Sequence, residues 1–270
     1  MLSHATKRTV LRLLSPLDAL VLRLNGKSEF PPLHLRWDVG PLRGYERSAA
    51  EYRIFLHLFA GLTSDKSVLD IGCGCGQMAQ ELLNDLGTAG KYEGWDINRE
   101  AILWCQNHIA HRDSRFSFRH LALSNGLYQP GSGSDASVFT FPIARLFDII
   151  LLKSVFTHLL KAEVQNYLSQ MPKLLTSKGK TLVSCFLLNA ERDQAATAGR
   201  TSIVFKPFAE HVAVANPLVP EGIVAYDESA MLDMIARAGL RLSSSPVYGA
   251  WAGDASALTH QDLLILERAE

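Results

Sequence analysis

Several features that mark particular protein classes are missing from this sequence of 270 residues. Its four cysteines form no Cys-x-x-Cys pair, so neither a zinc site of the usual spacing nor a thioredoxin-like motif is expected. Lysine plus arginine and aspartate plus glutamate each number 27, which gives zero formal net charge. This balance argues against a dedicated DNA- or RNA-binding protein, which neutralises phosphates with an excess of cations. With no Asn-x-Ser/Thr acceptor site and no disulfide pattern, we predict a cytoplasmic protein.

Long apolar runs are also lacking, because no stretch approaches the roughly 20 residues that a membrane-spanning helix needs. Residues 5–24 instead hold four cations and one acid, Asp18, and their leucines and valines recur at helical spacing. Ser15-Pro16 interrupts the pattern as a helix cap followed by proline in the first turn. We therefore predict two short helices, of which the second ends near Gly26.

These helices and the connector at Pro31-Pro32 define a predicted basic, amphipathic extension over residues 1–32. We expect its apolar side to pack on the domain that follows, as amphipathic helices of globular proteins do. The alternative is that residues 5–24 lie on a membrane surface, which would make the protein membrane-peripheral. A secretory signal is disfavoured, since Arg12 and Asp18 interrupt any apolar centre.

Strand and helix patterns alternate from about residue 46 onward. Predicted strands cover 67–71, 92–96, 116–122, 147–152, 181–186, 240–247 and 262–267, and predicted helices cover 46–62, 77–86, 99–110, 161–175 and 227–238. This alternation predicts one α/β domain over residues 33–270, with a mostly parallel sheet and helices on both faces. Ligands of such sheets bind beyond the carboxyl ends of the strands. Residues 189–226 show no period, and we expect an irregular substrate-binding insert or lid there.

A glycine-rich loop between a predicted strand and a predicted helix is the most informative stretch. It reads Val68-Leu69-Asp70-Ile71-Gly72-Cys73-Gly74-Cys75-Gly76-Gln77. Glycines let the backbone pass close to a ligand, and the start of a helix offers unpaired N–H groups. The dinucleotide fingerprint Gly-x-Gly-x-x-Gly fails because Gln77 stands where its third glycine belongs. A nicotinamide-dependent oxidoreductase is therefore disfavoured, and no Gly-Lys-Ser/Thr follows to make a P-loop.

Asp96 ends the next predicted strand, about 20 residues beyond the glycine loop, where such folds place an acid that binds ribose. A carboxylate at this point can accept hydrogen bonds from both ribose hydroxyls. The alternative is that Asp96 caps the helix that begins at Asn98-Arg99.

The spacing Asp70-x-Gly72-x-Gly74-x-Gly76, followed by Asp96, resembles the first motifs of class I S-adenosylmethionine (SAM)-dependent methyltransferases. Phe147-Asp148-Ile149-Ile150 resembles the fourth strand of that superfamily, and the resemblance covers about residues 33–270. It implies a Rossmann-like sheet of seven strands in the order 3-2-1-4-5-7-6, with the seventh strand antiparallel. Lys178-Gly179-Lys180 resembles the family's turn before the fifth strand.

The resemblance also implies SAM as the cofactor. Its expected binding residues are Asp70, Gly72, Cys73, Gly74, Gly76, Gln77, Asp96, Ile97, Ala122, Leu123 and Lys153. No metal is expected, because the fourth strand ends Leu151-Leu152-Lys153-Ser154 and lacks the Asp-Asn pair of catechol-type enzymes. Cys73 and Cys75 are expected to be small loop residues.

For methyl transfer to a hydroxyl group, a side chain must remove a proton. His158, just beyond the fourth strand, is our candidate for this general base, and His211 in the insert is the alternative. We expect a methyltransferase that acts on a small molecule, at a hydroxyl oxygen of a glycan, a lipid-linked compound or a natural product. A SAM-binding regulator without turnover and a protein or RNA methyltransferase remain the alternatives.

Overall fold

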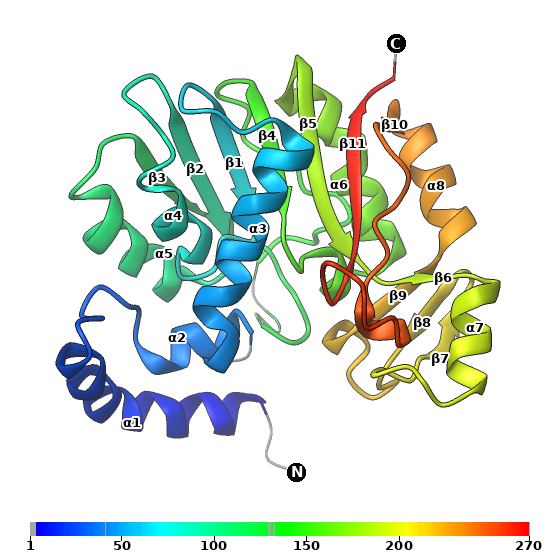
Figure 1. Cartoon of the computed structure of the whole chain (residues 1–270), viewed down its shortest axis with the longest axis horizontal. Helices are drawn as coiled ribbons and strands as arrows, with labels where there is room; N and C mark the ends of the chain where they lie inside the picture. Colours follow the sequence, from blue (N-terminus) through cyan, green and yellow to red (C-terminus); the bar gives the residue numbers. More distant parts are fainter. Residues whose placement is uncertain (1–3, 41, 129–130, 132, 270) are drawn as a thin grey trace.

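A sheet of seven strands forms the centre of the computed structural model, which describes residues 4–40, 42–128, 131 and 133–269. The strands are β1 (Ser67–Ile71), β2 (Lys91–Asp96), β3 (Phe116–His120), β4 (Phe147–Leu152), β5 (Leu175–Cys185), β10 (Leu240–Leu242) and β11 (Asp262–Arg268). Across the sheet they follow the order β3-β2-β1-β4-β5-β11-β10 (Figure 1). Counted within this sheet, the order is 3-2-1-4-5-7-6, as predicted.

The sheet is mostly parallel, and β11 is the antiparallel strand. Val68 of β1 pairs in register with Tyr92 of β2 on one side and with Ile149 of β4 on the other. All three side chains are fully buried, as expected for strands that helices cover on both faces. β11 runs antiparallel to both β5 and β10, which confirms the predicted seventh strand.

Helices cover both faces of this sheet and divide its core in two. One face packs against α3 (Tyr45–Ala60), α4 (Gln77–Leu82) and α5 (Arg99–Cys105). The opposite face packs against α6 (Lys161–Leu174) and α8 (Glu228–Arg237). The helix at 99–110 is one element as predicted, although its last turn, η2 (Gln106–Ala110), widens to π-helical hydrogen bonding.

Two predicted strand boundaries are wrong. Lys178-Gly179-Lys180 does not precede the fifth strand but lies within it, because β5 already begins at Leu175 and carries a bulge there. Leu175 pairs with Phe147 while Lys180 pairs with Ile149, so the extra residues of β5 loop out and pairing continues beyond them. At the other edge, β10 ends at Leu242, and only an isolated bridge from Val247 to Leu263 follows.

The prediction of an irregular stretch over 189–226 is also wrong. This segment contains α7 (Ala190–Thr197), β7 (Lys206–Ala209), β8 (Val212–Val214), η4 (Pro220–Gly222) and most of β9 (Val224–Asp227). With β6 (Leu187–Leu188), these strands form a second sheet in the order β6-β9-β8-β7, at the lower right of Figure 1. Its strands are too short to show a period in the sequence, yet β8 is wholly buried.

The N-terminal segment is a single helix, α1 (His4–Leu24), and not two. Pro16 lies inside it and removes one N–H donor, while the Ser15 hydroxyl donates to the carbonyl oxygen of Leu11 at 2.9 Å. α1 packs beside α2 (Leu33–Asp38), and none of its residues is buried. Most of its leucines and valines are exposed, so the expected apolar packing on the domain is wrong; the exposed ones are Val10, Leu13, Leu14, Leu17, Leu20, Val21 and Leu24. No described helix is long and apolar enough to cross a membrane.

Candidate functional site

A cavity of about 840 Å³ lies beyond the carboxyl ends of β1, β2 and β4. The chain reverses its strand order between β1 and β4, and at such a point the loops diverge and leave room for a ligand. The glycine loop after β1 forms one wall, and the segment around α2 forms another. The size suits a cofactor together with a small acceptor.

The glycine loop has a backbone that side chains would disrupt. Gly72, Gly74 and Gly76 all have positive φ angles, of 80°, 53° and 77°. A Cβ atom on Gly72 would lie 2.4 Å from Cγ2 of Val155, and one on Gly74 would lie 2.2 Å from Cγ1 of Val39. The three glycines therefore combine a left-handed conformation with close packing, which other residues cannot match.

Asp96 is held in place by two backbone donors. The Gly74 N–H donates to its Oδ2 and the Asn98 N–H to its Oδ1, each at 2.7 Å. Burial raises the pKa of Asp96, and these two hydrogen bonds oppose that rise. Asn98, whose Oδ1 accepts from the Ala101 N–H at 3.2 Å, is the cap of α5. Asp96 lines the cavity, and each of its oxygens keeps acceptor capacity.

A second carboxylate, that of Asp70, is buried at the end of β1. Its Oδ2 accepts a 2.5 Å hydrogen bond from the Tyr92 hydroxyl, while its Oδ1 has no partner among the described residues. Burial raises the pKa of Asp70 to about 7. Burial likewise lowers the pKa of Lys153 to about 8, and the ammonium donates to Oε1 of Gln77 at 2.5 Å. The unpartnered oxygen fits a donor supplied by a bound molecule, since leaving it unsatisfied is costly.

The cysteines near the glycine loop lie in surroundings that disfavour the thiolate. Cys73, Cys75 and Cys105 are buried, and burial raises the pKa of Cys75 to about 12. The thiols are therefore neutral, and only a thiolate is a strong nucleophile.

His158 ends the short helix η3 (Phe156–His158) at the far side of the cavity. Its Nδ1 lies 2.9 Å from the carbonyl oxygen of Glu221. Because a carbonyl only accepts, Nδ1 carries the hydrogen and Nε2 keeps its lone pair in the neutral ring. Burial lowers the pKa of His158, so the ring is neutral at pH 7. Its geometry suits a proton acceptor.

Tyr128 approaches the same imidazole and was not predicted. Its hydroxyl lies 3.5 Å from Nε2 of His158, and the two rings meet edge to face. Asn125 fixes this arrangement, since its amide donates to the His158 carbonyl and its Oδ1 accepts from the Tyr128 N–H. The polar stretch 124–135 carried no signal beyond that of a loop, so sequence patterns could not single out Tyr128.

Most of the predicted site residues line this one cavity. They are Asp70, Gly72, Cys73, Gly74, Gln77, Asp96, Ile97, Leu123, Lys153 and His158. Gly76, Ala122 and His211 are not among its lining residues. A Cβ on Gly76 would meet Ile109, so this glycine serves packing against η2. His211 is half-exposed between β7 and β8 and pairs with Asp227 at 2.8 Å, which places it away from the cavity.

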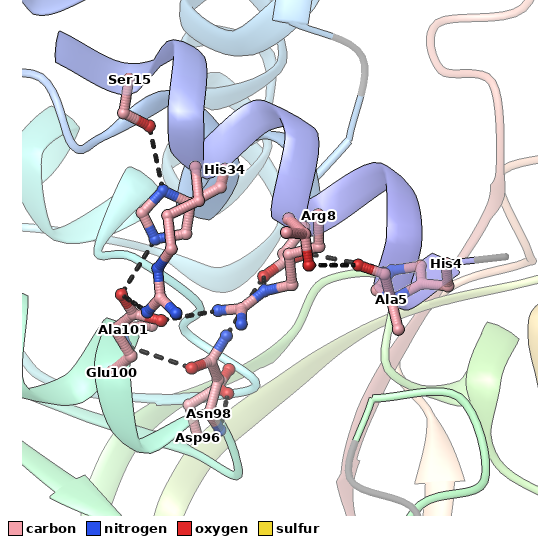
Figure 2. Close-up of polar contacts among 12 residues, drawn as sticks. His4, Ala5, Arg8, Ser15, His34, Asp96, Asn98, Glu100 and Ala101 are labelled. Atoms are coloured by element: carbon pink, nitrogen blue, oxygen red, sulfur yellow. Dashed lines mark hydrogen bonds and ion pairs between the residues drawn. The ribbon is translucent and has the colours of Figure 1, made fainter. Parts of the chain in front are cut away.

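An ionic cluster joins α1 to the end of the cavity near Asp96, and Figure 2 shows Arg8 of this helix pointing toward Asn98 and Glu100. Arg8 donates to Oδ2 of Asp38 at 2.8 Å and to Oε2 of Glu100 at 2.9 Å. Nε2 of His34 lies 2.9 Å from Oε1 of Glu100, and the Asn98 amide donates to Oδ2 of Asp38 at 3.2 Å. Asp38 lines the cavity, and its Oδ1 is buried without a hydrogen bond among the described residues.

The cluster sets the charge of Glu100. Burial alone would raise its pKa, but hydrogen bonds from Arg12 and His34 outweigh burial and lower the pKa to about 2. Asp38 and its neighbours were not predicted, because they lie outside the glycine-loop motif and owe their place to the packing of α2.

Comparison with known proteins identifies the family. A family model described as a methyltransferase domain matches residues 62–216. The chain belongs to the class I SAM-dependent methyltransferases. SAM is accordingly the cofactor of this methyltransferase.

Solved structures share the fold of this methyltransferase. An SAM-dependent methyltransferase from Clostridium acetobutylicum superposes with a TM-score of 0.53 at 12% identity, over 84% of this chain and 92% of that one. The 1,6-didemethyltoxoflavin-N1-methyltransferase of Burkholderia thailandensis gives 0.52 at 14% identity, over 100% and 92%. The mitomycin 7-O-methyltransferase MmcR gives 0.53 at 16% identity, over 99% and 61%.

Proposed function

We propose that this methyltransferase transfers a methyl group to a hydroxyl oxygen of a small, largely apolar acceptor, with His158 as the general base. One observation carries the proposal: the lone pair of a partly buried, neutral imidazole lies in the same cavity as the glycine loop. When bound, SAM supplies a methyl group on a positively charged sulfur, which a nucleophile attacks in line.

The cofactor end of the cavity, defined by Asp70, Gly72, Gly74 and Asp96, would hold SAM. The free lone pairs of Asp96 suit the two ribose hydroxyls. The unpartnered Oδ1 of Asp70 suits a donor on the amino-acid part, and the glycine backbone permits close approach. Cys73, Gln77 and Lys153 would line the amino-acid part, and Ile97 and Leu123 would flank the adenine ring.

The acceptor end, defined by Tyr128 and His158, would orient and deprotonate the hydroxyl. As the oxygen–methyl bond forms and the sulfur–methyl bond breaks, Nε2 of His158 takes the hydroxyl proton. The Glu221 carbonyl stabilises the resulting imidazolium through Nδ1–H. Tyr128 is close enough to help orient the acceptor.

The lining of the cavity supports an apolar or aromatic acceptor. Trp37, Tyr52, Tyr128 and Tyr167 contribute aromatic surface, which suits an apolar or aromatic compound. Two structural neighbours are named as a mitomycin 7-O-methyltransferase and a 1,6-didemethyltoxoflavin-N1-methyltransferase. We propose a natural-product or lipid-linked alcohol or phenol as the acceptor, ahead of a glycan.

In this proposal residues 33–270 carry out methyl transfer. The insert at 189–226 contributes η4, whose Glu221 carbonyl positions His158. Residues 1–32 form an extension that supports the wall of the cavity through α1.

A turnover assay over panels of phenols, lipid alcohols and saccharides tests the proposal. Once an acceptor is found, His158→Ala should lower turnover roughly 10²- to 10⁴-fold while SAM affinity by calorimetry stays unchanged. His211→Ala is the matched control and should keep normal turnover. A protein that binds SAM but methylates nothing would favour a regulator, and normal turnover of His158→Ala would refute the base.

A further inference from the structure

The helix α1 is oriented with its polar side toward the domain. Arg8 pairs with Asp38 and Glu100, and Asp18 pairs with Arg36 of α2. Ser15 lies 3.1 Å from the ring of His34. These contacts attach the helix by ion pairs and hydrogen bonds, and they leave its other side free.

That other side is a continuous apolar surface, which we name the α1 apolar face. It consists of Val10, Leu13, Leu14, Leu17, Leu20, Val21 and Leu24, each between 46% and 79% exposed. At 100° per residue these side chains occupy an arc of roughly 120° opposite the attached side, over a length of about 21 Å. Contiguous exposed apolar patches of this kind mark interaction sites.

The dimensions of the face favour a lipid surface over a second copy of the chain. A footprint about 21 Å long and about 10 Å wide is far smaller than the roughly 800 Å² per partner of a stable interface. Its arc is also broader than the narrow seam of a two-helix coiled coil. A helix lying in a bilayer surface needs neither a large footprint nor a narrow seam.

Positive charge at the edges of the α1 apolar face also favours a lipid surface as its partner. Lys7 and Arg23 lie on α1 outside its attached side and form no ion pair with any described residue. Free cations beside an apolar helix face attract anionic headgroups.

We propose that α1 binds the surface of an anionic lipid membrane through its apolar face. The same helix supplies His4 to the lining of the cavity, so a docked α1 brings the cavity close to the lipid surface. This placement favours an acceptor that resides in the membrane, an inference that rests on the proposed methyl transfer.

Flotation of the full-length protein with vesicles of phosphatidylcholine and phosphatidylglycerol tests the proposal. We expect the protein to float, and the triple variant Leu13→Asn, Leu17→Asn, Leu20→Asn to lose at least about 10-fold in its bound fraction. Lys7→Gln with Arg23→Gln should weaken binding to anionic vesicles severalfold and leave binding to neutral vesicles unchanged.

The control is a second triple variant, Leu58→Asn, Leu218→Asn, Leu258→Asn, whose leucines are also exposed but lie elsewhere. It should float like the natural protein, and unchanged SAM binding by calorimetry verifies that both variants are folded. If the natural protein does not float, or if the α1 variant floats equally well, the proposal is wrong. If the natural protein does not float but is a dimer, and the α1 variant is a monomer, the α1 apolar face binds a second copy of the chain. None of these readouts depends on methyl transfer.

Discussion

The two ends of the cavity differ in how the chain builds them. The cofactor end comes from two neighbouring strand-loop-helix units, in which β1 leads into the glycine loop and β2 leads into Asp96. The acceptor end joins His158 of η3, Tyr128 of the loop after β3 and the Glu221 carbonyl of η4. Local geometry therefore fixes the first end, whereas the second depends on long-range packing. We expect substitutions at the first end to change SAM affinity, and those at the second to change turnover.

Gly74→Val should give the largest effect on SAM affinity. The new side chain would overlap Val39 at 2.2 Å and force a β-branched residue to a φ of 53°. We expect SAM to bind at least about 100-fold more weakly, close to 3 kcal/mol, in calorimetry.

The matched control is Gly199→Val, because Gly199 also has a positive φ, of 67°, but has no atom within 4 Å of the added Cβ. The Gly199→Val variant has the backbone strain without a steric clash, and it should bind SAM normally. Equal loss in both variants would show that strain alone, and not the shape of the cradle, is responsible.

Asp96→Ala should weaken SAM binding by about 1–3 kcal/mol, since two hydrogen bonds to a carboxylate are lost. The backbone donors of Gly74 and Asn98 also lose their acceptor. Asp65→Ala, at an exposed position outside the cavity, should leave calorimetric affinity unchanged. An unaltered affinity in a folded Asp96→Ala protein would remove Asp96 from the cofactor end.

The features that could be predicted from the sequence follow the same division between the two ends of the cavity. The positions of the glycine loop and Asp96 were predictable because each follows a contiguous strand pattern, whereas the sheet order was implied by the resemblance to class I SAM-dependent methyltransferases. Tyr128 and Asp38 were not predictable, since a loop and a short helix bring them to the cavity only through tertiary contacts. The second sheet was missed because its strands have two to four residues. The orientation of α1 was predicted wrongly because an amphipathic pattern does not determine whether the apolar or the polar side of a helix faces the domain.

Tyr128→Phe should have a smaller effect than Asp96→Ala, and it should change turnover alone. Removing one hydroxyl near Nε2 of His158 should lower kcat by about 5-fold, equivalent to one neutral hydrogen bond, with SAM affinity unchanged. Tyr248→Phe, which loses a hydroxyl bonded to Glu228 outside the cavity, is the control. A larger change in SAM affinity than in kcat would place Tyr128 at the cofactor end.

Glu100→Gln should have the smallest effect. The carboxylate is about one-third exposed, so losing its charge should cost the protein less than about 1 kcal/mol. Because the folded-state pKa is lowered to about 2, the stabilising charge is present above pH 4.5 and is lost as the pH falls toward 2. Hydrogen exchange should show α1 losing protection in Glu100→Gln at neutral pH. Glu267→Gln, at the distant pair with Arg241, should leave α1 protected.

The pH dependence of kcat at saturating SAM tests the central claim, that a neutral His158 takes the proton. Burial lowers the pKa of His158 below its ordinary 6.5, so kcat should rise with pH through a value under 6.5 and then level off. His158→Gln should remove this rise along with most of the rate, whereas His211→Gln should retain it. The same rise in His158→Gln as in the natural enzyme would contradict the account, because the titrating base would then be another group.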